Sequence, residues 1–141
     1  MEEKKVVKVV AGIIYNENGE ILCTQRDKGK QEIVSYKWEF PGGKIEQGET
    51  KQMALARELQ EELEIKVDIK DAFYQVEYDY PEFHLSMTVF NCNLISHNIH
   101  INVHKAIKWL KPSGLLELDW TDADLPVAQK IYEQNCGKLS S

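Results

Sequence analysis

Residues 40–65 read FPGGKIEQGETKQMALARELQEELEI, a glycine-rich turn followed by a helix-forming segment. Leucines recur at Leu55, Leu59 and Leu63, which is the spacing of one face of an α-helix. With Thr50 as a suitable N-cap, the pattern predicts a helix from about Lys51 to Leu63. Because the leucine face must pack against a core, this segment also fixes the direction of its other faces.

The opposite face of this helix carries three carboxylates, Glu58, Glu61 and Glu62. At about 100° per residue they fall in one stripe, where the small Ala54 leaves room beside them. Ala56 is expected to extend the apolar leucine face. Like charges three or four residues apart destabilise an isolated helix by roughly 0.2–0.5 kcal/mol, so the stripe must face either water or a cation.

Glutamate-rich stretches are usually solvated helix surface, but the surroundings of this stripe favour a metal site. Arg57 can pair with Glu61 or reach back to Glu49, and either contact would hold a carboxylate in one orientation. Carboxylate oxygens suit Mg²⁺ or Mn²⁺, whose remaining ligands are waters and substrate phosphate. The sequence therefore indicates a divalent-cation site that handles phosphate.

The spacing of these residues resembles the signature of the Nudix family, Gly-x5-Glu-x7-Arg-Glu-hydrophobic-x-Glu-Glu-x-Gly-hydrophobic. Eight of its nine specified positions agree between Gly43 and Ile65. The exception is Glu64, which stands where the signature has a glycine of the kind that caps helices. Residues 11–14, 25–26, 38–44 and 123–126 also resemble the MutT-like and CTP pyrophosphohydrolase-like branch of this family.

The resemblance implies an α/β fold, the Nudix fold, with a mixed β-sheet sandwiched between helices. It also implies a set of catalytic, metal-binding and phosphate-binding residues. The catalytic residues would be Glu61, Glu58, Arg57 and Glu49; the metal-binding residues Glu58, Glu61 and Glu62 with a carbonyl of Gly42 or Gly43; and the phosphate-binding residues Arg26 and Lys44. Lys44 can be interpreted nearly as well as a solvated loop lysine.

The group that activates the attacking water is left open. MutT-like proteins often carry an acid just before the tryptophan equivalent to Trp109, and residues 103–108 contain none. A signature carboxylate such as Glu61, the metal alone, or His104 as a substitute base could take that role. His97, His100 and His104 are otherwise interpreted as solvated loop histidines, because nothing predicts a helix that would gather them.

For the nucleobase, the informative residue is Asp124. In the related proteins the matching position meets the base edge, where an ionised carboxylate accepts from an amine such as cytosine N4 and a protonated one also donates to a guanine-type carbonyl. The alternative is that Asp124 caps a helix from Val127. Phe40, Tyr78 and Phe83 are candidates for stacking on the base, although aromatic residues at such positions are more often core.

Length and composition set further bounds. A chain of 141 residues with 43% hydrophobic content is expected to form a single domain over residues 1–141. The net charge of −6 argues against binding to a nucleic-acid polymer. We expect a cytoplasmic monomer or homodimer without membrane association, and three widely spaced cysteines fit free thiols better than a disulfide scaffold.

Alternating and β-branched residues predict the strands of the sheet. Expected strands cover about 6–15, 20–26, 38–40, 66–78, 83–94 and 107–110, with loops at 27–36 and a turn from Pro112. A second helix is expected over 127–135.

The leading hypothesis is a metal-dependent nucleoside triphosphate pyrophosphohydrolase that releases the monophosphate and pyrophosphate. CTP or dCTP and an oxidised nucleotide such as 8-oxo-dGTP compete as substrates. The alternatives are hydrolysis of a dinucleotide or nucleotide sugar, and a non-catalytic nucleotide-binding module.

Overall fold

The computed structural model describes residues 4–28, 35–96 and 98–137. Its strands are β1 (Lys5–Tyr15), β2 (Ile21–Gln25), β3 (Trp38–Glu39), β4 (Gly42–Lys44), β5 (Val67–Asp79), β6 (Phe83–Leu94) and β7 (Ala106–Leu110). Two α-helices, α1 (Lys51–Leu63) and α2 (Leu125–Cys136), and a 3-10 helix, η2 (Pro112–Glu117), complete the described elements.

The strands form one mixed sheet in the order β3-β2-β1-β6-β5, with β4 paired to β1 and β7 paired to β2. β1 runs parallel to β6 along its whole length and antiparallel to β4 and β2. One edge of β1 is therefore shared, because Val9–Ala11 pair with β4 and Tyr15 pairs with β2. This sharing brings the glycine turn against the middle of the sheet.

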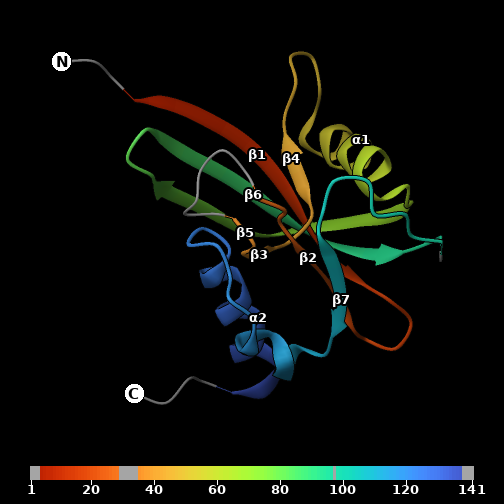
Figure 1. Ribbon diagram of the computed structural model, residues 1–141. Helices are drawn as coiled ribbons and strands as arrows, with labels where there is room; N and C mark the ends of the chain where they lie inside the picture. The colour runs from red at the N-terminus through yellow and green to blue at the C-terminus, as the bar shows by residue number, and fades with distance from the viewer. Residues whose placement is uncertain (1–3, 29–34, 97, 138–141) are drawn as a thin grey trace.

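Helices cover both faces of the sheet, with α1 and α2 on opposite sides (Figure 1). Alternate side chains of β1 pack on opposite faces of the sheet: Ile13 belongs to the core under α2, and Ile14 belongs to the core under α1. The period of two along a strand explains this division. The expectation of a mixed sheet sandwiched between helices is confirmed.

Helix α1 begins and ends as its sequence predicts. The Thr50 hydroxyl accepts a hydrogen bond from the Met53 N–H at 3.1 Å, which is an N-cap contact. Leu55, Leu59 and Leu63 are buried, as expected. The prediction for Ala56 is wrong, because that residue is exposed, while Ala54 is fully buried.

The remaining predicted elements agree with the structure apart from their ends. The turn expected from Pro112 is the 3-10 helix η2, and the second helix begins two residues earlier than predicted, at Leu125. Part of the predicted 27–36 loop and His97 lie outside the described residues. The three cysteines are free thiols, as expected, with Cys23 and Cys92 buried and Cys136 exposed.

None of the described helices combines the length and the apolar character needed to cross a membrane.

Candidate active site

A cavity of about 500 Å³ opens between the glycine turn, α1, strands β1 and β6 and the segment before α2. Its volume lies in the range of sites that bind a small organic molecule, roughly 300–1,000 Å³. One end is acidic and lined by Glu39, Glu58 and Glu62, and the other is apolar and aromatic. The cavity therefore offers two chemically different environments to one ligand.

The glycine turn approaches α1 so closely that a side chain would collide. A Cβ on Gly43 would lie 2.4 Å from the Glu58 carboxylate, and one on Gly42 would lie 1.9 Å from the carbonyl oxygen of Val10. A larger residue would have to displace the Glu58 carboxylate at position 43 or the backbone of β1 at position 42. The turn residues and Glu58 consequently line the cavity together, as the signature spacing predicts.

Arg57 is hydrogen-bonded to carboxylates on the acidic face of α1 and to the loop before the helix. Its Nε and Nη2 donate to the two oxygens of Glu49 at 2.6 and 2.9 Å, and its Nη1 donates to Glu58 and Glu61 at 2.9 Å each. Nη2 also donates to the carbonyl oxygen of Lys44 at 2.9 Å. These contacts lower the pKa of Glu49 and raise the pKa of Arg57 above its ordinary range. The arginine thus ties the loop, the turn and the helix into one rigid unit.

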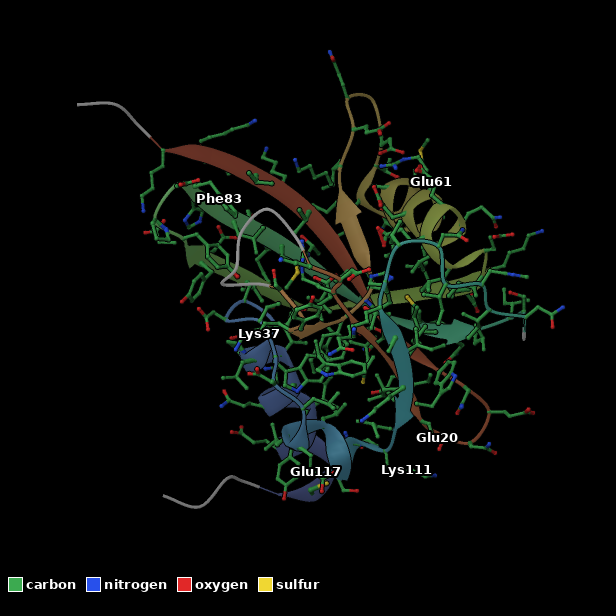
Figure 2. All side chains as sticks on the ribbon, in the orientation of Figure 1. Glu20, Lys37, Glu61, Phe83, Lys111 and Glu117 are labelled. Carbon is green, nitrogen blue, oxygen red and sulfur yellow. The ribbon has the colours of Figure 1, made fainter. Side chains whose placement is uncertain are left out.

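Glu49, Arg57 and Glu61 lie outside the set of described residues that line the cavity. The Glu61 side chain is 54% exposed and pairs with Arg57 four residues earlier, as the sequence predicts. Figure 2 shows Glu61 on α1, across β4 from Phe83 in that view. Glu58 and Glu62 therefore line the cavity and Glu61 does not, although Glu58 and Glu61 accept hydrogen bonds from the same nitrogen of Arg57.

The carboxyl group of Glu62 lies in an environment that opposes its negative charge. Burial, followed by repulsion from Glu58 and Glu39, raises the pKa of Glu62 to about 8. Arg26 opposes this shift but does not cancel it. An arrangement that forces carboxylates together at a cavity wall is costly on its own and becomes favourable when a cation bridges them.

This donor set fits a hard divalent cation. Glu58 and Glu62 offer oxygen ligands next to the backbone of Gly42 and Gly43, and oxygen is what Mg²⁺ and Mn²⁺ prefer. Among the described residues, no three acidic, histidine or cysteine side chains already surround a single point as a finished ion site. Most of the coordination sphere would therefore come from water, backbone or phosphate oxygens, which is the usual situation for Mg²⁺.

The two predicted phosphate-binding residues both line the cavity. The Arg26 side chain is 42% exposed, and its Nη1 donates to Glu39 at 2.9 Å. Lys44 is exposed at the cavity rim. Both basic side chains therefore belong to the cavity wall, and the Glu39 carboxylate holds Arg26 in place.

The structure adds two residues, Glu39 and His104, to the acidic end that were not predicted at these positions. Glu39, from β3, lines the cavity and pairs with Arg26. The interpretation of His104 as a solvated loop residue is wrong, because its side chain is only 4% exposed and its Nε2 lies 3.5 Å from Glu39 and 3.9 Å from Glu62. Its Nδ1 is buried without a hydrogen-bond partner among the described residues, which costs about 1–3 kcal/mol.

Asp124, which is 4% exposed, also lines the cavity. Asp124 occupies the N-cap position of α2, but its side chain makes no cap hydrogen bond. Instead, its Oδ2 accepts from the Phe40 N–H at 3.0 Å. Side-chain capping, one of the two roles considered for Asp124, is therefore absent.

Burial raises the pKa of Asp124 well above the ordinary aspartate value, and repulsion from Glu39 adds to the rise. The Phe40 N–H, Arg26 and Thr121 act in the opposite direction. A raised pKa favours the neutral form of this carboxyl over its ionised form. A neutral carboxyl can donate one hydrogen bond as well as accept others.

The three aromatic candidates have different surroundings. Phe40 and Phe83 line the cavity, and Phe40 also stacks on Trp120 with ring centroids 4.6 Å apart. Tyr78 is outside the described cavity lining, donates to Asp122 at 3.2 Å and packs on Tyr80. Tyr80, which was not among the predicted stacking residues, lines the cavity and stacks on Phe83 with ring centroids 5.0 Å apart.

Comparison with known proteins agrees with this geometry. The 8-oxo-dGTP diphosphatase of Escherichia coli strain K12 is 35% identical to this chain over 127 residues, which are 90% of this chain and 97% of that protein. The CTP pyrophosphohydrolase of the same strain is 35% identical over 130 residues, covering 89% of this chain and 90% of that protein.

Among solved structures, the MutT protein from Methanosarcina mazei Go1 superposes with a TM-score of 0.84 at 24% identity, covering 96% of this chain and 99% of that one. This likeness supports the fold. The family described as the NUDIX domain matches residues 5–134. Family match, fold and signature residues agree, and the chain belongs to the Nudix family.

Proposed function

We propose that this protein is a divalent-metal-dependent nucleoside triphosphate diphosphatase that releases a nucleoside monophosphate and pyrophosphate. The observation that carries the proposal is the cavity itself. Its carboxylate and glycine end lies beside its aromatic end, which holds the buried Asp124. A nucleotide has the same division, with a polyphosphate at one end and a planar base at the other.

At the acidic end, Glu58 and Glu62 would bind the cation with help from the backbone of Gly42 and Gly43. A bound divalent cation neutralises phosphate charge and lowers the pKa of a coordinated water. Arg26 and Lys44 would contact the phosphate oxygens from the side of β2 and the turn. Arg57 would keep Glu58 in place through Glu49 and the Lys44 carbonyl, so that the phosphates meet a preorganised surface.

At the aromatic end, the hydrogen bond from Phe40 points to one class of base. Oδ2 of Asp124 already accepts from the Phe40 N–H, so the proton of the neutral carboxyl is best placed on Oδ1. An Oδ1–H group donates, and a guanine-type carbonyl is the matching acceptor. We therefore place a guanine-type base, such as that of 8-oxo-dGTP, ahead of cytosine, whose amine would need an acceptor.

The test is a comparison of kcat/KM across a panel of nucleotides in the presence of Mg²⁺. The panel contains CTP, dCTP, dGTP and 8-oxo-dGTP, with a dinucleotide polyphosphate and a nucleotide sugar as the alternative substrate classes. We expect monophosphate and pyrophosphate from the triphosphates, with 8-oxo-dGTP highest. A higher value for CTP would overturn the base assignment. Failure to cleave any triphosphate would overturn the activity.

A further inference from the structure

The segment between β6 and β7 closes the C-terminal end of α1. The His100 N–H donates to the carbonyl oxygen of Leu63, and the Asn102 N–H donates to that of Glu62, each at 3.0 Å. The Asn102 side chain adds a bond to the Glu61 carbonyl oxygen at 2.9 Å. The last carbonyls of a helix have no partner within the helix, so these contacts satisfy them.

The same segment is then fixed to the sheet. The Lys105 N–H donates to the carbonyl oxygen of Gln25 at the end of β2, at 2.9 Å. His104 lies between these two anchor points, and the segment therefore carries its imidazole into the space between α1 and β3. Val103, its neighbour, is 55% exposed, so the segment buries the histidine in particular.

The imidazole presents one nitrogen to two carboxylates from different elements. Nε2 is 3.5 Å from an oxygen of Glu39 on β3 and 3.9 Å from an oxygen of Glu62 on α1. The buried Nδ1 has no partner among the described residues. A proton on Nε2 rather than Nδ1 leaves only a lone pair unmatched, and it directs the N–H toward the carboxylates.

We propose that His104 is a positioning residue for the cation site, holding Glu39 and Glu62 in the orientation that a divalent cation requires. Glu39 is also paired with Arg26. His104 therefore lies between Glu62, which faces the metal site, and Glu39, which holds the phosphate-facing Arg26. His104 comes from outside the 43–65 signature, and its position depends on the capping of α1. The inference rests on the proposed function only for the presence of a cation at Glu62.

The physical argument is one of preorganisation. Glu39 and Glu62 each place a carboxylate oxygen within 4 Å of the same nitrogen of His104, so the two negative charges lie close together and repel one another. Without a donor between them, the two carboxylates would turn apart, and a cation would have to reorient both on binding. Groups that orient metal ligands in this way typically change metal affinity or activity by about 10- to 100-fold when they are removed.

The test measures binding of Mn²⁺ alone, by the loss of the free-ion electron paramagnetic resonance signal, and separately the Mg²⁺ concentration for half-maximal activity. His104→Leu keeps an apolar side chain in the buried site and removes the donor. His104→Asn keeps an amide that is too short to reach both carboxylates, whereas His104→Gln places its amide nitrogen near the position of Nε2. His100→Gln is the matched control, because that side chain is exposed in the same segment.

We expect the Leu and Asn variants to bind Mn²⁺ about 10- to 100-fold more weakly, with the Gln variant close to the parent. The Mg²⁺ midpoint should shift in the same order, while the KM for nucleotide at saturating Mg²⁺ changes little. Unchanged Mn²⁺ binding in a folded Leu or Asn variant would overturn the proposal. Because Mn²⁺ binding needs no turnover, a parent protein that binds Mn²⁺ but cleaves no nucleotide would count against the proposed function and leave this inference standing.

Discussion

At the scale of single residues, Asp124 shows how burial changes what a side chain can do. The carboxyl is buried beside Glu39 and accepts from the Phe40 N–H. Burial and the repulsion from Glu39 raise its pKa despite the Phe40 hydrogen bond, so the folded chain keeps a proton to higher pH than the unfolded chain, which loses it above about pH 3.8. Between that pH and the raised pKa the folded state binds more protons, and its stability must fall as pH rises.

We therefore predict that Asp124→Asn stabilises the protein relative to the parent, and increasingly so as the pH is raised above the ordinary aspartate value. Asparagine keeps the acceptor for the Phe40 N–H and has no proton to lose. The measurement is the melting temperature of both proteins from acid to mildly alkaline pH. Below the ordinary aspartate pKa the two should converge, and parallel curves over the whole range would contradict a raised pKa.

The three signature glutamates on α1 are predicted to differ in their importance for catalysis. Glu58→Gln and Glu62→Gln should each lower kcat/KM by about 10³-fold or more, because each removes a cavity-facing carboxylate. Glu61→Gln should lose less, since its side chain is 54% exposed and pairs with Arg57 away from the cavity. Steady-state kinetics on variants with native circular dichroism decide this, and an equal loss at Glu61 would count against the assignment.

The residues within the signature could be predicted from sequence because helix periodicity alone places Glu58 and Glu62 on one face. Glu39 and His104 could not be predicted in this way. Their roles depend on β3 pairing with β2 and on the segment that caps α1, and these are contacts between distant parts of the chain. Spacing also placed Ala56 on the buried face, whereas the helix buries Ala54.

At the scale of elements, the two glycines of β4, Gly42 and Gly43, should respond differently to substitution because β4 packs closely between β1 and α1. A Cβ at Gly43 meets the mobile end of Glu58, whereas a Cβ at Gly42 meets the backbone of Val10. Gly43→Ala should fold and lose most activity by displacing Glu58. Gly42→Ala should lower the free energy of unfolding by about 1–3 kcal/mol, because the backbone of β1 must shift.

Chemical denaturation and kinetics on both variants test this difference, with Gly114→Ala as the control. A Cβ at Gly114 would meet no atom closer than 3.8 Å. If Gly43→Ala retained full activity, the close approach of the turn to Glu58 would not matter for catalysis.

The end of α1 provides a prediction about stability. Glu64 has φ 55°, ψ 40°, a left-handed conformation that glycine adopts without strain. Glu64→Gly should therefore raise the free energy of unfolding by about 0.5–1 kcal/mol, or the melting temperature by roughly 2–5 °C. The side chain also accepts from Asn102 at 3.1 Å, so Glu64→Ala is the control that loses this contact without relieving the backbone. Equal stability of the two variants would contradict the strain argument.

The bounds of individual helices and strands were easier to predict than the strands or groups with which they pair. The 13 residues of α1 and the ends of β6 agree with the sequence pattern, because periodicity and a cap are local signals. The parallel pairing of β1 with β6 joins distant parts of the chain and was not predicted, because the family resemblance implied only that the sheet is mixed. The side chain of Asp124 likewise accepts a hydrogen bond from the distant Phe40 N–H and does not cap the helix that follows it.

At the scale of the whole molecule, the formal net charge of −6 opposes the approach of a polyphosphate. The cavity wall adds to this opposition, because Glu39, Glu58 and Glu62 converge there. A bound divalent cation reverses the local field, so cation and nucleotide should depend on one another for binding. Hydrolysis without a divalent cation should accordingly be negligible.

The most direct test is the identity of the products formed from 8-oxo-dGTP, with and without Mg²⁺, by the parent protein and by Glu58→Gln. The account predicts equal amounts of nucleoside monophosphate and pyrophosphate from the parent with Mg²⁺, and almost none in the other three reactions. The opposite result would be a nucleoside diphosphate with inorganic phosphate, or cleavage that proceeds equally well without the cation or without the Glu58 carboxylate. Any of these would contradict a metal-dependent diphosphatase centred on Glu58.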